Sequence, residues 1–208
     1  MTFYPYNARK AAAQTAQTDV GTTRVSLVSQ PVKVSLSAAE AATASTTAVH
    51  AAGTTYGTGP VTVSTGITNP PYPRNLTATT GGTAGDIKAG SVVVTGTNIN
   101  DEVIEETLPT FTVDSATTVV GNYAFKTVTS YIVPDMDGDA ASVALGFGDK
   151  IGLPYMLDNN TVLLATLAGV REVTAPTVVA DNNEVHKNTV DLSSALNASA
   201  VDIYLIVG

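Results

Sequence analysis

The stretch that decides the fold class runs from residue 91 to residue 108: Ser91-Val92-Val93-Val94-Thr95-Gly96-Thr97, then Asn98-Ile99-Asn100-Asp101, then Glu102-Val103-Ile104-Glu105-Glu106-Thr107-Leu108. Two short runs rich in β-branched residues flank a turn of Asn and Asp, which is the pattern of two antiparallel strands. Comparable runs separated by turn residues recur on both sides, over residues 61–65, 76–80, 125–133, 141–147, 161–167, 170–174, 178–179, 185–190 and 200–207. This spacing predicts an all-β fold with an antiparallel β-sandwich or barrel-like domain.

Two of these runs make sharper predictions. Residues 125–133 carry apolar side chains at both alternating sets of positions, so this strand is expected in the middle of a sheet. Residues 200–207 form the most apolar run, which predicts that the C-terminal strand is held in a sheet. Between them, Gly146, Gly148, Gly152 and Pro154 predict an irregular loop after residue 147.

The first third of the chain has a different pattern, and we divide the sequence into three parts on this basis. Residues 1–20 are expected to form an extended N-terminal arm, and residues 73–208 the main β-sandwich domain. Residues 21–72 are expected to hold short strands and one short helix near 38–51, because Ser37 and Glu40 have capping-box spacing and Gly53 suits a helix end. The three prolines of residues 69–74 predict a stiff crossover that ends this part.

The composition of the chain argues against nucleic-acid binding and membrane insertion. The chain has 208 residues, a net charge of −8, 13% charged residues and no cysteine. Threonine occurs 32 times and supplies polarity without charge. Because no basic run exists, nucleic-acid binding lacks its electrostatic basis. No stretch is apolar enough for a membrane span, and the first residues lack a signal peptide's apolar region, so we expect synthesis in a cytoplasm and no membrane partner.

The sequence contains no strong motif of a catalytic site. The two histidines, His50 and His186, have no second metal ligand at suitable spacing, and no serine or cysteine nucleophile motif occurs. Glu102, Glu105 and Glu106 have the residue type of a glycosidase pair, but on a threonine-rich strand they are more often a solvated face. We therefore expect no enzyme activity and no cofactor.

One acidic turn is a weak candidate for a Ca²⁺ site. Asp135, Asp137 and Asp139 alternate around Gly138, and carboxylates in this arrangement can bind Ca²⁺. The remaining positions of a calcium-binding loop are absent, and Asp and Gly are common in ordinary turns. The preferred interpretation is therefore a turn without metal.

Candidate partner-binding residues lie mainly at the N-terminus. Phe3, Tyr4 and Tyr6 are aromatic anchors of the type that interface hot spots favour. Arg9 and Arg74 complete this predicted set.

Several strings together carry a family resemblance: Thr65 to Pro70 with Pro73 to Leu76, Val94 to Asn98, Glu105 to Pro109, Phe125 to Thr129, Gly148-Asp149-Lys150-Ile151-Gly152-Leu153-Pro154, and Asn188 to Leu192. The combination resembles structural proteins of tailed-bacteriophage virions, in particular head decoration (cement) proteins. It extends from about residue 47 to the C-terminus and leaves out the N-terminal arm.

The resemblance implies a function and partners. A decoration subunit binds the major capsid protein on the outside of the assembled head, often as a homotrimer, and stabilises the shell against the pressure of the genome. Its location would be the virion. A tail-tube, baseplate or fibre subunit, the last with glycan binding, remains an alternative.

Overall fold

The computed structural model describes residues 16–18, 21–23, 30–53, 56–57 and 59–207. Within these ranges the chain is all-β, as predicted, and every strand pair is antiparallel. The strands are β1 (Ala16–Thr18), β2 (Gly21–Thr23), β3 (Gln30–Leu36), β4 (Ser45–Gly53), β5 (Val61–Val63), β6 (Arg74–Gly82), β7 (Val93–Thr97), β8 (Val103–Thr107), β9 (Thr118–Val120), β10 (Thr127–Val133), β11 (Ala141–Gly152), β12 (Val162–Leu167), β13 (Val170–Arg171), β14 (Thr177–Val179), β15 (Thr189–Asp191) and β16 (Val201–Val207). Two short 3-10 helices, η2 (Ala84–Asp86) and η3 (Val185–Lys187), complete the elements.

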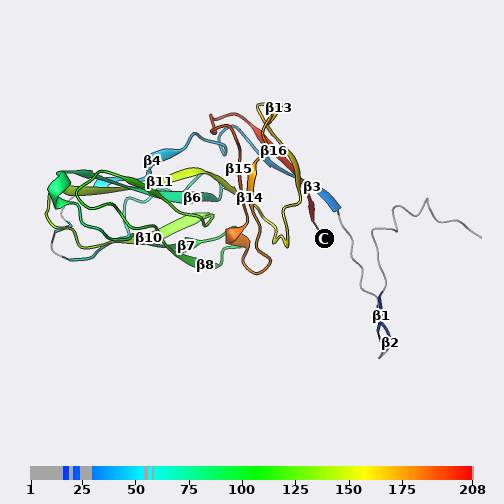
Figure 1. Cartoon of the computed structure of the whole chain (residues 1–208), viewed down its shortest axis with the longest axis horizontal. Helices are drawn as coiled ribbons and strands as arrows, with labels where there is room; N and C mark the ends of the chain where they lie inside the picture. The colour runs from blue at the N-terminus through cyan, green and yellow to red at the C-terminus, as the bar shows by residue number, and fades with distance from the viewer. Residues whose placement is uncertain (1–15, 19–20, 24–29, 54–55, 58, 208) are drawn as a thin grey trace, which may run out of the picture.

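Three sheets build the body of the molecule (Figure 1). The β10 sheet has the order β5-β10-β7-β8, and the β16 sheet has the order β13-β12-β16-β3. The β11 sheet has the order β14-β15-β11-β6-β9, and β4 also pairs with β11. Strands β10 and β16 are both internal, which confirms the two predictions made from the apolar runs 125–133 and 200–207.

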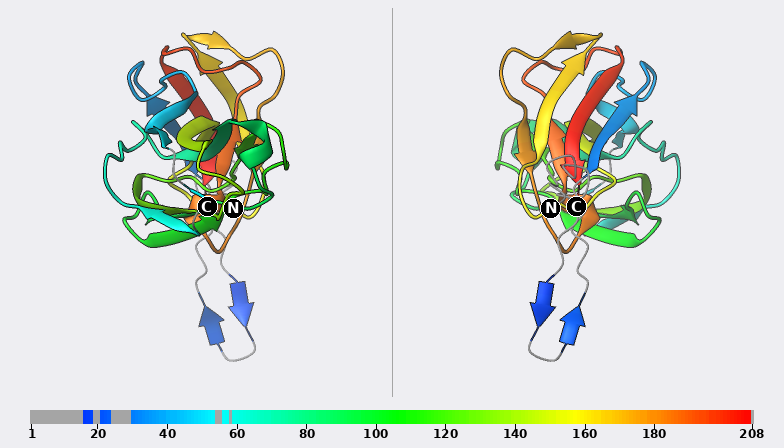
Figure 2. Two further views of the ribbon diagram at one scale, coloured as in Figure 1. Left: turned by 90° about the vertical axis from the view of Figure 1, so that its left-hand side faces the viewer. Right: turned by 90° about the vertical axis from the view of Figure 1, so that its right-hand side faces the viewer.

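Two hydrophobic cores lie at opposite ends of the body. The first is enclosed by the β10 and β11 sheets, with Tyr131 and Leu145 completely buried. The second lies under the β16 sheet, shown with β12, β16 and β3 side by side in Figure 2, and contains Ile203 and Leu196. Alternation of buried and half-buried residues along the first five positions of β16 follows the side-chain period of a strand.

Strand β11 belongs to both cores, and its continuity corrects a prediction. Its first half buries Val143 and Leu145 in the first core, and Ile151 near its end belongs to the second. We expected an irregular loop after residue 147, but the strand continues to Gly152. A glycine in this strand instead allows a neighbouring backbone to come close. At Gly146, a Cβ would overlap the carbonyl oxygen of Ser45 in the adjacent β4.

The helix predicted near residues 38–51 is wrong. The capping contacts do form, since the Ser37 backbone N–H donates to Glu40 Oε2 at 2.8 Å, but they support only one turn. Residues 45–53 form β4 and pair with β11. Thr46 and Thr47 are β-branched and favour a strand, and tertiary pairing with β11 outweighs the cap.

The division of the chain into residues 1–20, 21–72 and 73–208 stays a prediction. The proline-rich segment connects β5 of the β10 sheet to β6 of the β11 sheet, in keeping with the expected crossover. Strands β3, β4 and β5 each pair with a strand that follows residue 73. The arm predicted over residues 1–20 lies largely outside the described residues.

Candidate functional site

A buried arginine joins the two cores. The side chain of Arg74 is completely buried at the start of β6. Its Nε donates to the carbonyl oxygen of Gly148 at 2.8 Å, and its Nη1 donates to the carbonyl oxygen of Ala42 at 3.0 Å. Its Nη2 lies 3.3 Å from Asp149 Oδ1, and the guanidinium carbon lies 5.1 Å from the Phe147 ring centroid. Burial lowers the pKa of Arg74 to about 10, a shift that the charge of Asp149 opposes.

Two buried asparagines extend this arrangement. Asn75 donates from Nδ2 to the carbonyl oxygen of Gly121 at 3.1 Å and accepts the Lys150 backbone N–H at 3.0 Å. The side-chain oxygen of Asn188 accepts the backbone N–H groups of Leu157, at 3.1 Å, and Asp181, at 2.8 Å. We call Arg74, Asn75, Gly148, Asp149 and Asn188 the Arg74 joint.

The joint brings together three of the sequence strings on which the resemblance was based. Residues 73–75, 148–154 and 188–192 are distant in sequence, yet Gly152 N–H donates to the carbonyl oxygen of Pro73, and Leu153 N–H donates to that of Asn188, both at 2.8 Å. Arg74 was predicted to contact a partner. In the structure its side chain is completely buried and its donors are used within the chain.

A concave feature lies where the β7–β8 turn faces the η3 loop. Two adjoining hollows of about 370 Å³ and about 260 Å³ share Val103, Ile104, Glu184 and His186. Met156 lines the first hollow, and Tyr123, Glu105 and Lys187 line the second. We call this feature the His186 groove. Its wall is apolar in part, because Val103 is 76% exposed and Met156 is 57% exposed.

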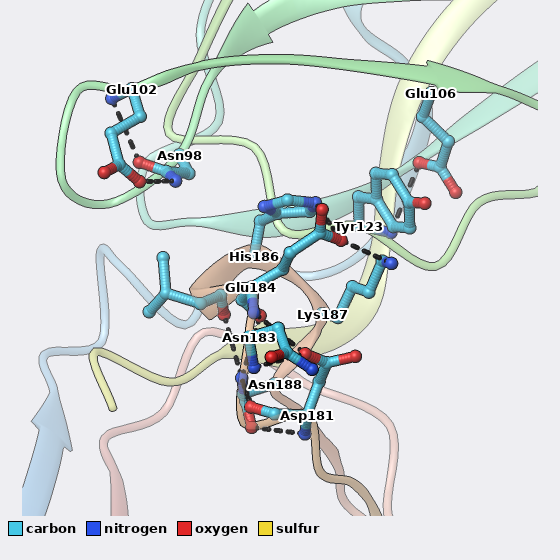
Figure 3. A network of polar contacts seen from close by, with 11 residues as sticks. Asn98, Glu102, Glu106, Tyr123, Asp181, Asn183, Glu184, His186, Lys187 and Asn188 are labelled. Atoms are coloured by element: carbon cyan, nitrogen blue, oxygen red, sulfur yellow. Dashed lines mark hydrogen bonds and ion pairs between the residues drawn. The ribbon is translucent and has the colours of Figure 1, made fainter. Parts of the chain in front are cut away.

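His186 is held between aromatic and charged neighbours (Figure 3). Its ring packs edge-on against Tyr123, with centroids 4.6 Å apart, and its Nε2 lies 3.5 Å from Glu184 Oε2. The same Glu184 carboxylate pairs with Lys187. Burial lowers the pKa of His186, an effect that Glu184 opposes and Lys187 reinforces. The histidine is therefore favoured in its neutral form at neutral pH.

The three glutamates of the β8 region divide into two kinds. Glu102 and Glu105 are exposed, as expected of a solvated face, but Glu106 is buried, and for this residue that expectation is wrong. Its carboxylate accepts the backbone N–H groups of Asn122, at 2.6 Å, and Tyr123, at 3.2 Å. Burial raises the pKa of Glu106, and these two bonds oppose the rise. Glu106 therefore orders the loop that supplies Tyr123.

The acidic turn uses its carboxylates within the chain. Asp135 accepts from Lys88 Nζ at 3.1 Å and from Gly59 N–H at 2.8 Å, and Asp139 accepts from Gly57 N–H at 3.2 Å. Asp137 lies 3.8 Å from the same lysine. Across the described ranges, no three metal-binding side chains converge on one point. The turn fastens the segment before β5 to the segment after β10.

Other predicted residues have the following positions. His50 lies in β4, and its Nδ1 is 2.9 Å from the Tyr131 hydroxyl. Phe3, Tyr4, Tyr6 and Arg9 lie outside the described residues. The groove was not predicted, because its residues come from four separate segments and share no local spacing. In the part of the chain that the structure describes, no helix is long and apolar enough to cross a membrane.

Comparison with known proteins gives no relative. No protein family, no curated protein and no solved structure matches the chain.

Proposed function

We propose that the chain is a non-enzymatic structural subunit of a tailed-bacteriophage virion that binds the outer surface of the head. The observation that carries the proposal is the sequence resemblance, whose strings around residues 74, 148 and 188 meet in one buried joint. Segments that are distant in sequence but contact each other in the structure hold the fold together at that point. Their buried polar groups serve stability, which is what a reinforcing subunit requires.

The surface offers a second line of support. Large apolar side chains are exposed around the β12–β13 hairpin, where Leu163 is 56% exposed, Val170 is 69% exposed and Val173 is fully exposed. Apolar contacts of this kind belong to the core of protein interfaces. Many subunits that each bind weakly can still reinforce a shell, because multivalent attachment raises the overall affinity.

Binding to purified heads tests the proposal. We expect the protein to co-sediment with heads that lack it, and to raise the temperature at which they release their genome. The double variant Val170→Ser with Val173→Ser should lower occupancy, whereas Val113→Ser, at a separate site that is 52% exposed, should not. Binding to tails, assembly into tubes, or turnover of a substrate would each contradict the head assignment.

The tail and fibre roles make different predictions. A tail-tube or baseplate subunit polymerises into rings or tubes that electron microscopy detects. A glycan-binding fibre module binds a sugar array with saturable affinity. The head assignment predicts neither result.

A further inference from the structure

We infer that the His186 groove is the receptor for the N-terminal segment, residues 1–10, of a second copy of this chain. The inference concerns assembly between copies and does not depend on the virion setting. In the proposed contact, an acidic and partly apolar groove binds a segment that is basic and aromatic.

The groove offers apolar contacts next to negative charge. Val103 and Met156 expose more than half of their surfaces to solvent, an unusual position for such side chains. Glu102, Glu105 and Glu184 line the same hollows, and Lys187, the one lysine among the lining residues, is paired with Glu184. Methionine adapts well to aromatic rings, which makes Met156 a suitable contact for one.

The N-terminal segment has the complementary composition. Residues 1–10 contain Arg9 and Lys10 and no acidic residue, so their side chains carry +2. The whole chain has 10 basic and 18 acidic residues, so the other 198 residues have 8 and 18, a net charge of −10. Phe3, Tyr4 and Tyr6 add three of the twelve aromatic side chains of the chain. A basic and aromatic segment on an acidic protein is attracted to acidic, apolar grooves.

The occupant is a second copy because the chain between residue 10 and β3 is long enough to reach one. Among the described residues, strands β1 and β2 pair with each other and with no strand of the three-sheet body. The roughly 20 residues between residue 10 and β3 span up to about 65 Å when extended, enough to reach a neighbouring molecule. Reciprocal exchange would bury two grooves in each pair.

A charge-swap experiment on the full chain tests the inference. Variant A carries Arg9→Glu and Lys10→Glu, and variant B carries Glu102→Lys and Glu105→Lys. Sedimentation velocity should show concentration-dependent self-association of the wild type at low salt, and each variant alone should bind itself about tenfold more weakly or worse. An equimolar mixture of A and B should associate again, because each segment then meets a groove of opposite charge. The control Asp114→Lys, in an exposed loop, should behave as the wild type.

Cross-linking locates the contact. Because the chain has no cysteine, single substitutions introduce unique thiols. A mixture of Tyr6→Cys and Met156→Cys chains should form a mixed disulfide dimer under mild oxidation, whereas Tyr6→Cys with Thr46→Cys, on exposed β4, should not.

Three results would overturn the inference. The first is a wild type that stays monomeric at all concentrations. The second is association that charge reversal leaves unchanged. The third is an equimolar mixture of A and B that fails to associate, since the segment and the groove would then not be partners.

Discussion

The Arg74 joint and the His186 groove both bring charged groups together, but the Arg74 side chain is shielded from water, whereas charged groups of the groove are exposed to it. Arg74 is completely buried and directs its donors to two backbone carbonyl groups and one carboxylate. In the groove, Glu102 and Glu105 are exposed next to exposed apolar side chains.

Because of this difference, we expect the Arg74 joint to contribute mainly to stability and the His186 groove mainly to recognition. A buried charge is tolerated only when its hydrogen-bonding groups are satisfied, so loss of one joint partner leaves others unpaired. An exposed charge is hydrated, so its loss changes stability little but alters what the surface attracts. Substitutions in the two regions should therefore affect different measurements.

The largest effect is expected from Arg74→Met. The substitution keeps an unbranched apolar chain but leaves the carbonyl groups of Gly148 and Ala42 without these donors. We expect a loss of about 3–5 kcal/mol in the free energy of unfolding, measured by chemical denaturation. Arg171→Met, at an exposed position of β13, is the matched control and should change little. Equal effects of the two substitutions would contradict the joint.

Asn188→Ala should have the next largest effect. It removes the acceptor for the N–H groups of Leu157 and Asp181, and the donor to the carbonyl of Glu184. Unpaired buried groups of this kind destabilise by about 1–3 kcal/mol, and we expect about 2 kcal/mol by the same measurement. Asn159→Ala, at an exposed position, should lie within about 0.5 kcal/mol of the wild type.

A smaller effect should follow from pH through His186. Because burial lowers its folded-state pKa below the ordinary value of 6.5, the unfolded chain takes up the proton first as pH falls. The stability from neutral His186 is present above pH 6.5 and is lost as pH falls through the lowered pKa. Unfolding measured from pH 7.5 to 5 should show this decline, and His186→Gln should reduce it. An unchanged pH profile in His186→Gln would contradict the assignment.

The smallest stability effect is expected from Glu105→Gln in the groove. The free energy of unfolding should stay within about 0.5 kcal/mol of the wild type. Self-association at low salt should nevertheless weaken, because one of the groove's exposed charges is removed. A large loss of stability would show that the groove is part of the structural framework after all.

Local sequence patterns determined most of the strands but misassigned residues 185–187, which form η3, as well as two longer segments. Alternating β-branched residues located β7, β8, β10 and β16, because side-chain period and propensity act within each strand. Capping residues predicted a helix where β4 forms, and glycines predicted a loop within β11. Both errors have the same kind of cause: β4 is stabilised by pairing with β11, and the end of β11 by pairing with β15 and β6, and no local pattern records these pairings.

The sequence by itself determined the all-β class, the threonine-rich composition with few charged residues, the absence of thiol chemistry and the basic, aromatic character of residues 1–10. Only the tertiary structure decided that Arg74 is buried, that Glu106 orders a loop, and that residues near 103, 123, 156 and 186 form one groove. The reason is physical. Strand propensity depends on neighbours in sequence, whereas burial and convergence depend on the order in which strands pair across the sheets.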